Sequence, residues 1–334
     1  MSEQGVRLGL ADSAFLAFLG PRDKSPWRIA LSVIGGVIVG AIAALACVIL
    51  AWVFYTVITD HWREGVAGLG RAAVALKNAD GKDLTSAVLL MVTAVATNGP
   101  FVLAFVALAA ILMGHRLKDY VTAAPAIRWR LLIAGLVLSA IVVAPVMAAD
   151  RLLTPGAAPM PILVVSQATS GRALYAVAAV LLLIGAAAAE ELLLRGWLLR
   201  QIAAFTRQPV VLIAATALVF SALHGEFSLD AFVTRALMGA GFAYMTLRLG
   251  GIEFSTGAHA ANNILIVLFI EPLTLKTAAA AADMSMASLL EDVALVIGYI
   301  VITEAVVRIE PLRRWAGVRA SELSRSVATA ADFG

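Results

Sequence analysis

The sequence predicts an all-α membrane protein that crosses the bilayer several times, and three observations support this fold class. Hydrophobic residues make up 61% of the 334 residues. Charged residues make up only 14%, whereas soluble domains carry roughly 25%. The third observation is a series of apolar segments that are long enough to cross a bilayer. A chain of this size with so few charges cannot cover a globular surface, and its mean hydropathy of +0.93 indicates a lipid environment.

Eight apolar segments are expected to form a bundle of about eight transmembrane helices around a polar cavity. Helices are expected because backbone groups inside the hydrocarbon must be satisfied within their own segment. The first segment is too long for a signal-peptide core, so we expect it to be retained. In the second, Asn98-Gly99-Pro100 predicts a kink or a split. The predicted spans are Ile29–Thr59, Leu84–Gly114, Leu131–Ala149, Ala173–Ala203, Pro209–His224, Ala231–Leu249, Ile252–Ile270 and Ser288–Val307.

The chain is expected to divide into four parts. Residues 1–28 form a cytoplasmic or interfacial segment, and 29–172 hold the first three spans with their loops. Residues 173–311 form a catalytic helical core of about five spans, and 312–334 form a cytoplasmic tail. Lys and Arg gather in the loops of one predicted side, which places both termini in the cytoplasm. The expected location is the plasma membrane, or the inner membrane of a bacterium.

Charge and cysteine content narrow the function classes. The net charge is only +3, so no nucleic-acid partner is expected. The single cysteine, Cys47, lies in an apolar segment and provides neither an intrachain disulfide nor a cysteine-rich metal site. The expected surroundings are the lipid bilayer and a peptide or membrane-anchored protein substrate.

Ionisable residues inside spans are informative, because each costs about 2.5–3.5 kcal/mol to insert at the bilayer centre. Here they cluster in the second half of the chain. Glu190 lies 17 residues before Arg207 (207 − 190), and His224 lies 17 residues after it (224 − 207). If the fourth and fifth spans form a hairpin at Arg207, both residues lie roughly 25 Å from the turn, at 1.5 Å per residue. Glu190 and His224 are therefore expected to face each other at one depth.

Helical spacing assigns two further pairs. His259 and Asn263 are four residues apart and share one helix face. Glu191 and Arg195 are also four apart, in an order that favours an ion pair supporting the site. Because adjacent residues diverge by about 100° on a helix, Glu190 remains free to face a polar cavity.

A free carboxylate, two imidazoles and an amide suffice for peptide hydrolysis. A carboxylate can take a proton from water, an imidazole can orient that water, and the remaining donors can stabilise the oxyanion. The sequence contains no Gly-x-Ser-x-Gly and no His-Glu-x-x-His motif. Catalytic zinc usually has three protein ligands. Only His224, His259 and one carboxylate could serve, and using Glu190 would remove the base. We therefore expect no tightly bound metal, with a divalent ion such as zinc as the alternative.

Three segments of this region also resemble a known family. Glu190-Glu191-Leu-Leu-Leu-Arg195, Phe220-x-x-x-His224 and His259-x-x-x-Asn263 are similar to the three motifs of the CAAX-protease and bacteriocin-processing family, which includes the type II CAAX prenyl endopeptidases. The resemblance covers roughly 173–270. It implies an eight-helix intramembrane endopeptidase with a cavity open to the cytosol. It further implies that Glu190 and His224 activate water, while His259 and Asn263 hold the oxyanion.

Other readings of the same residues remain open. A proton-coupled transporter could use Glu190 and the histidines as a relay, although transporters often show repeated halves and none is evident. A non-catalytic membrane scaffold would retain only the fold. Arg235 is expected to extend to the outer interface, and Glu304 to pair with Arg308. Gly36-x-x-x-Gly40 predicts close helix packing.

Overall fold

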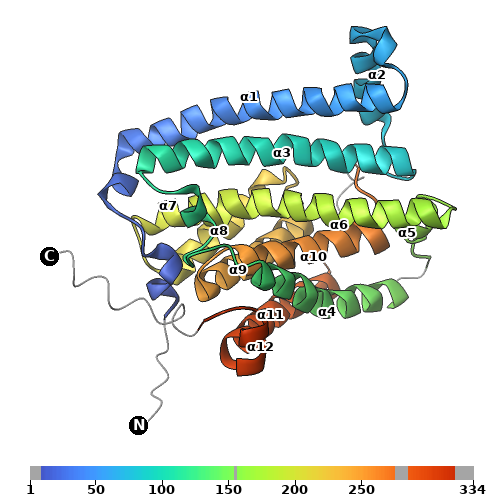
Figure 1. Ribbon diagram of the computed structural model, residues 1–334. Coiled ribbons are helices and arrows are strands. Elements are labelled where there is room, and N and C mark those ends of the chain that lie inside the picture. The colour runs from blue at the N-terminus through green and yellow to red at the C-terminus, as the bar shows by residue number, and fades with distance from the viewer. Residues whose placement is uncertain (1–8, 154–155, 275–284, 320–334) are drawn as a thin grey trace.

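The computed structural model describes residues 9–153, 156–274 and 285–319 and is an all-α bundle (Figure 1). Within these ranges there is no β-strand, only an isolated bridge between Thr122 and Gly251. Each of the eight predicted apolar segments coincides with a long helix. These helices are α1 Pro26–Ile58, α3 Leu84–Met113, α4 Trp129–Leu153, α6 Thr169–Glu191, α8 Pro209–Leu223, α9 Leu229–Leu249, α10 Glu253–Phe269 and α11 Met286–Arg308.

Four of the described helical segments are long and apolar enough to cross a membrane. They are α1, α3, α4 and the continuous segment Thr169–Ala203, while α8 is apolar but has only 15 residues. The prediction of a polytopic all-α protein is confirmed. Crossing by all eight helices stays a prediction, because α9, α10 and α11 do not meet the same criteria of length and composition.

Shorter elements connect the long helices. The loop 60–83 contains a helix, α2, that the sequence had not predicted. Of the kink or split predicted at Asn98-Gly99-Pro100, the split does not occur, because α3 continues through Pro100 as one helix. The short elements are α2 Val66–Asn78, α5 Pro161–Val164, α7 Leu199–Ala203, α12 Glu310–Trp315 and 3-10 turns at Leu10–Asp12, Ala14–Leu16, Pro21–Lys24, Trp62–Glu64 and Leu117–Tyr120.

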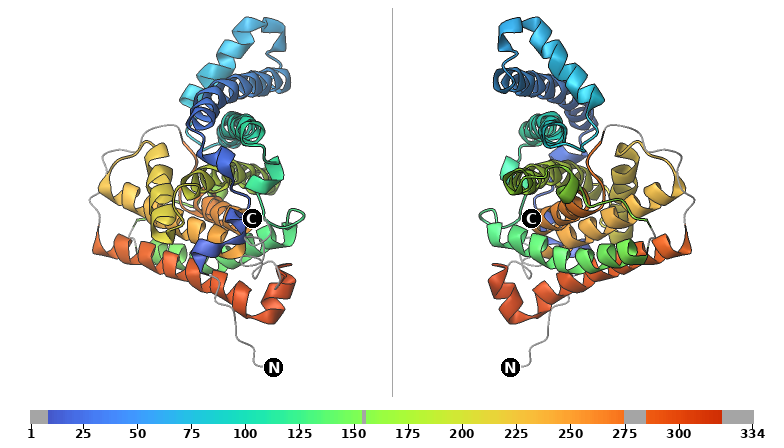
Figure 2. Two further views of the ribbon diagram at one scale, coloured as in Figure 1. Left: turned by 90° about the vertical axis from the view of Figure 1, so that its left-hand side faces the viewer. Right: turned by 90° about the vertical axis from the view of Figure 1, so that its right-hand side faces the viewer.

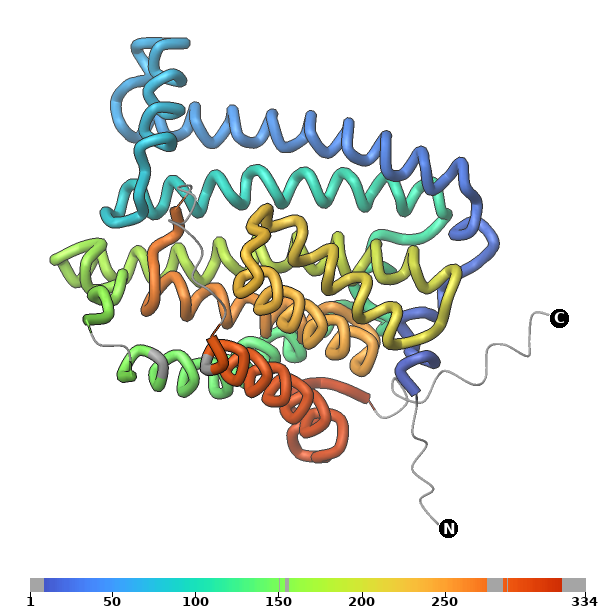
Figure 3. The backbone as a smooth tube through the Cα atoms, turned by 180° about the vertical axis from the view of Figure 1, so that it is seen from behind, coloured from blue at the N-terminus to red at the C-terminus, as the bar shows by residue number. Residues whose placement is uncertain are grey.

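The helices form layers with α10 at the centre. Figure 1 shows α1, α3 and α6 stacked one below another, and the end-on views of Figure 2 show α1 at the edge of the molecule. Helix α10 contacts α4, α6 and α9, and 13 of its 17 residues are buried. The view from behind in Figure 3 shows α8 and α9 lying together over this central helix. The helix of His259 and Asn263 therefore lies at the centre of the bundle, in contact with the helix of Glu190.

Small residues bring α1 and α3 into close contact. Gly36 and Gly40 are buried on the face of α1 that meets α3. A Cβ at Gly36 would lie 2.5 Å from the ring of Phe105, and one at Gly40 would lie 2.8 Å from the ring of Phe101. The predicted packing role of Gly36-x-x-x-Gly40 is confirmed. Phe105 in turn packs edge-on against Trp197, with ring centroids 4.8 Å apart.

The N-terminal segment packs against the bundle. The side chains of Phe15 and Leu16 are fully buried among residues that include Leu199, Leu212 and Ala243. These residues belong to α7, α8 and α9. The short turns before α1 are therefore anchored to the same helices that carry the polar motifs. Residues 1–8 and 320–334, which include most of the predicted tail, lie outside the described residues.

Candidate active site

The first motif lies where the fourth predicted span changes its helical form. Helix α6 ends at Glu191, and a π-helix over Leu192–Leu198 leads directly into α7. Glu190 and Glu191 thus occupy the last turn of α6, while Arg195 lies in the π-helix. Short π-helical stretches are rare and often mark functional sites. Helical periodicity in the sequence carries no signal for this change.

Glu191 and Arg195 form the predicted ion pair, and neither side chain is exposed. Arg195 Nη1 donates to Glu191 Oε1 at 2.9 Å, and Arg195 Nη2 donates to the Gly239 carbonyl at 2.7 Å. The guanidinium also lies 4.8 Å from the centroid of the Phe220 ring. At Gly239 a Cβ would lie 3.2 Å from Arg195 Nη2, so glycine leaves room for this approach. The pair connects the π-helix to α9.

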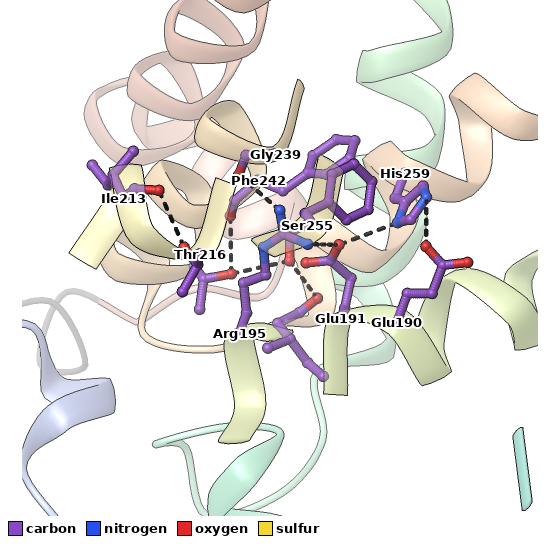
Figure 4. Close-up of polar contacts among 12 residues, drawn as sticks. Glu190, Glu191, Arg195, Ile213, Thr216, Gly239, Phe242, Ser255 and His259 are labelled. Atoms are coloured by element: carbon purple, nitrogen blue, oxygen red, sulfur yellow. Dashed lines mark hydrogen bonds and ion pairs between the residues drawn. The ribbon is translucent and has the colours of Figure 1, made fainter. Parts of the chain in front are cut away.

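His259 lies between the two glutamates, as Figure 4 shows. Its Nδ1 lies 3.1 Å from Glu191 Oε1, and its Nε2 lies 3.7 Å from Glu190 Oε2. Because the carboxylate of Glu191 accepts hydrogen bonds, Nδ1 carries the proton in this contact. The imidazole stacks on Phe242 with centroids 4.9 Å apart and 19° between the planes. Glu191 and Phe242 therefore fix the His259 ring with Nε2 toward Glu190.

His224 is held by its own helix. Its Nδ1 lies 2.8 Å from the carbonyl oxygen of Phe220, one turn earlier. A carbonyl only accepts, so Nδ1 donates, and in the neutral ring Nε2 is the acceptor. The ring also contacts the edge of Phe220 at a centroid distance of 4.8 Å. Phe220 touches the rings of both His224 and His259 and thereby connects the second and third motifs.

Glu190 and His224 line one cavity of about 290 Å³. The side chain of Glu190 is 27% exposed, unlike the fully buried Glu191, so the two glutamates differ as the sequence indicated. The structure adds Asn98 of α3 to this cavity. In the sequence, the only indication of a role for Asn98 is an amide side chain within an apolar segment, and this pattern predicts a helix break there and no functional role. The lining residues are Asn98, Phe101, Val102, Glu190, Leu193, Leu194, Phe220, Leu223 and His224.

Asn263 lies one turn beyond His259 on α10. It is partly exposed, whereas Asn262 is buried. Asn262 Nδ2 donates to Asn263 Oδ1 at 3.4 Å, which leaves the Asn263 amide hydrogens facing away from that contact. Neither Asn263 nor His259 is among the residues that line the 290 Å³ cavity.

The remaining ionisable residues of the spans have partners. Arg235 pairs with Glu226 at 2.7 Å. Glu304 accepts from Arg308 at 2.7 Å, as predicted, and also from Arg248 at 2.5 Å. Across residues 9–153, 156–274 and 285–319, no group of three or more His, Cys, Asp or Glu side chains is arranged to hold a metal ion.

The match to a known protein family covers the part of the chain that holds the candidate site. Residues 172–265 match the family model described as type II CAAX prenyl endopeptidase Rce1-like. The uncharacterized protein YyaK of Bacillus subtilis (strain 168) is 32% identical over 108 residues, which is 30% of this chain and 36% of that protein. This chain therefore aligns with about a third of that relative's length. No solved structure matches.

Proposed function

We propose that the chain is an intramembrane endopeptidase, because residues 172–265 match the family model of the type II CAAX prenyl endopeptidases. The single observation that carries the proposal is the cavity shared by Glu190 and His224, with the imidazole of His259 beside Glu190. A carboxylate and an acceptor nitrogen that open into one cavity are the groups needed to activate water for attack on a peptide bond.

In the proposed reaction Glu190 is the general base. The carboxylate takes a proton from a water molecule in the cavity, and the resulting hydroxide attacks the carbonyl carbon of the peptide bond. His224 Nε2 accepts the second hydrogen of that water, because Nδ1 already donates to Phe220. The proton held by Glu190 then passes to the leaving amine as the carbon–nitrogen bond breaks. The base is thus restored at each turnover.

His259 and Asn263 are the proposed oxyanion donors. His259 Nδ1 donates to Glu191, so an Nε2–H bond toward the oxyanion requires the doubly protonated ring. Asn263 offers amide hydrogens from the next turn of α10, and its partial exposure favours it over the buried Asn262. Glu191 and Arg195 act as positioning residues, because Glu191 holds the His259 ring. The His259 ring would thus be held in position before substrate binds.

Asn98 and its neighbours indicate how a substrate is held. An amide side chain can donate to a peptide carbonyl and accept from a peptide N–H. Phe101 and Leu223 provide an apolar wall of the same cavity. We therefore propose a substrate with an apolar side chain next to the scissile bond, in a peptide or a membrane-anchored protein near the membrane surface.

The test is a comparison of protein termini in membranes that contain either the wild type or the Glu190→Gln variant. New termini should appear only with the wild type and lie beside apolar residues. Glu310→Gln is the matched control, because it makes the same chemical change at an exposed carboxylate paired with Arg314. If the Glu190→Gln and wild-type membranes yield the same termini at equal expression, the endopeptidase proposal fails, and a relay or scaffold role replaces it.

A further inference from the structure

A second cavity, of about 540 Å³, lies away from the residues proposed for catalysis. One wall is the N-terminal segment just before α1, and the other is the connection between α7 and α8. Small residues leave this space open, and a Cβ at Gly20 would meet no atom within 4 Å. The lining residues are Leu19, Gly20, Pro21, Lys24, Ala203, Ala204, Phe205, Thr206 and Arg207.

Hydrogen bonds hold the two walls together. Gln201 Nε2 donates to the backbone carbonyl of Asp23 at 2.7 Å, which joins α7 to the N-terminal segment. The Asp23 carboxylate accepts from the Gly20 N–H at 2.7 Å and contacts His115 Nε2 at 2.8 Å. Asp23 is 4% exposed. The cavity is therefore part of the packed structure, and the acidic residue next to Lys24 is already engaged with other groups.

Two cations and a hydroxyl line the cavity. Lys24 and Arg207 are exposed and form no ion pair with the described residues. The carboxylate of Asp12, which is also exposed, acts on Arg207 through its charge without forming an ion pair with it. Thr206 Oγ1 accepts from the Gln208 N–H at 3.3 Å, so its own hydrogen is available to donate. Ammonium, guanidinium and hydroxyl donors around one space are the groups that bind phosphate.

Apolar side chains lie next to these donors. Phe205 lines the cavity and is 65% exposed, and Val210, at the start of α8, is 78% exposed. Exposed apolar surface beside cations at the end of a membrane-crossing helix suits the boundary between headgroups and acyl chains. A free phosphate ion would use only the donors, whereas a lipid would use both surfaces.

We propose that this cavity binds the phosphate group of an anionic membrane lipid, with Lys24, Arg207 and Thr206 as its donors and Phe205 beside the acyl chains. The site is independent of the proposed hydrolysis, because none of its lining residues touches the 290 Å³ cavity. It would tie the N-terminal segment, α7 and α8 to one membrane leaflet.

The test titrates phosphatidylglycerol or phosphatidylcholine into the full chain in detergent micelles and measures binding by native mass spectrometry and melting temperature. Phosphatidylglycerol should bind the wild type more tightly than phosphatidylcholine. The double variant Lys24→Gln/Arg207→Gln should weaken its binding by about thirtyfold, in line with the attraction of two cations to an anionic headgroup. Lys77→Gln/Lys82→Gln, which removes two exposed cations from the segment 60–83, should leave binding unchanged.

A third variant and a second ligand complete the design. Lys24→Arg/Arg207→Lys keeps both charges and should bind as the wild type does. Inorganic phosphate alone should give little protection. Equal binding of phosphatidylglycerol by the wild type and by Lys24→Gln/Arg207→Gln would overturn the proposal. Protection by inorganic phosphate that depends on Lys24 and Arg207, with no preference for phosphatidylglycerol, would instead assign the cavity to a free anion and overturn the lipid assignment.

Discussion

Helices α1 and α10 differ in how much of their surface is buried. In α1, the buried residues are five of 33, and side chains such as Ile42 and Leu50 are more than 60% exposed. In α10, 13 of 17 residues are buried, and they include Glu253, His259 and Asn262. Helix α1 lies at the edge of the bundle and presents an apolar surface, whereas α10 is enclosed by other helices.

This difference explains which helices hydropathy can identify. A helix surrounded by lipid must be apolar on nearly every side, because lipid offers its polar groups no partner. A helix surrounded by protein can carry ionisable residues, provided that its neighbours supply hydrogen bonds. The criteria of length and composition therefore find α1, α3, α4 and Thr169–Ala203 but not α10. His259 thus lies on a helix with a weak hydropathy signal, whereas Glu190 lies in a segment that meets the criteria.

The largest expected effect distinguishes a carboxylate that lines the cavity from one that is fully buried, and the test compares Glu190→Gln with Glu191→Gln. Glu190 lines the cavity, and if it is the proposed base, its substitution should lower turnover by about 10²–10⁴-fold with an unchanged melting temperature. Glu191 is fully buried against Arg195, so its substitution should lower the melting temperature. Two quantities are measured for each variant. One is the turnover of a peptide substrate identified from the comparison of protein termini, and the other is the melting temperature in detergent. Near-normal turnover in Glu190→Gln would contradict the assignment of the base.

Arg195→Ala should produce the largest loss of stability. The substitution leaves Glu191 as an unpaired charge in the core and removes the hydrogen bond to the Gly239 carbonyl. Breaking a buried pair costs about 3–5 kcal/mol. Arg314→Ala, which removes an exposed partner of Glu310, is the control and should cost less than about 1 kcal/mol. Similar melting temperatures for the two variants would show that the enclosed core tolerates an unpaired charge.

Asn98 connects the peripheral and central parts, because α3 contacts both α1 and α6. If its amide holds the substrate backbone, Asn98→Leu should raise KM by about tenfold, as expected for the loss of one or two hydrogen bonds of about 1 kcal/mol each, with a smaller change in kcat. Asn98→Gln should recover part of the loss. A fall in kcat with constant KM would instead place Asn98 in the chemical step.

Within α1, substitutions on the face that meets α3 should destabilise the protein, whereas substitutions on the exposed face should have little effect. Gly36→Leu places a side chain where the Phe105 ring already lies, and overpacking of this kind costs about 1–3 kcal/mol. Ile42→Ala, on the exposed face, should change the melting temperature far less. If both substitutions are equally harmful, α1 must pack against a partner on its outer face as well.

The smallest expected effect concerns pH and lies outside the helices that cross the membrane. Burial opposes ionisation of Asp23, but hydrogen bonds from His115 and the Gly20 N–H outweigh it and hold the pKa of Asp23 below its usual value. A lowered pKa in the folded state stabilises the protein above the unfolded pKa of about 3.9, and this stabilisation is lost as the pH falls. Asp23→Asn should therefore lower the free energy of unfolding by about 1 kcal/mol at neutral pH. The melting temperature of this variant should also depend less on pH below pH 4 than that of the wild type. If both proteins show the same pH dependence below pH 4, this prediction is wrong.

Some features of the protein follow from its sequence alone. The predicted apolar segments coincide with all eight long helices, and those that meet lipid must be apolar throughout and helical. Spacing along one helix predicts the pair of Glu191 with Arg195, since residues four apart lie on the same face. The three motifs together identify the family to which residues 172–265 are similar.

Other features depend on contacts between distant segments, and only the tertiary structure decides them. The π-helix at Leu192–Leu198 is a local change in hydrogen bonding that apolar periodicity does not report. Asn98 reaches the cavity of Glu190 and His224 because α3 packs against α6. Phe15 and Leu16 are buried because α7, α8 and α9 offer them a surface. In the last two cases the deciding contacts join residues far apart in the chain, and a pattern within one segment cannot contain them.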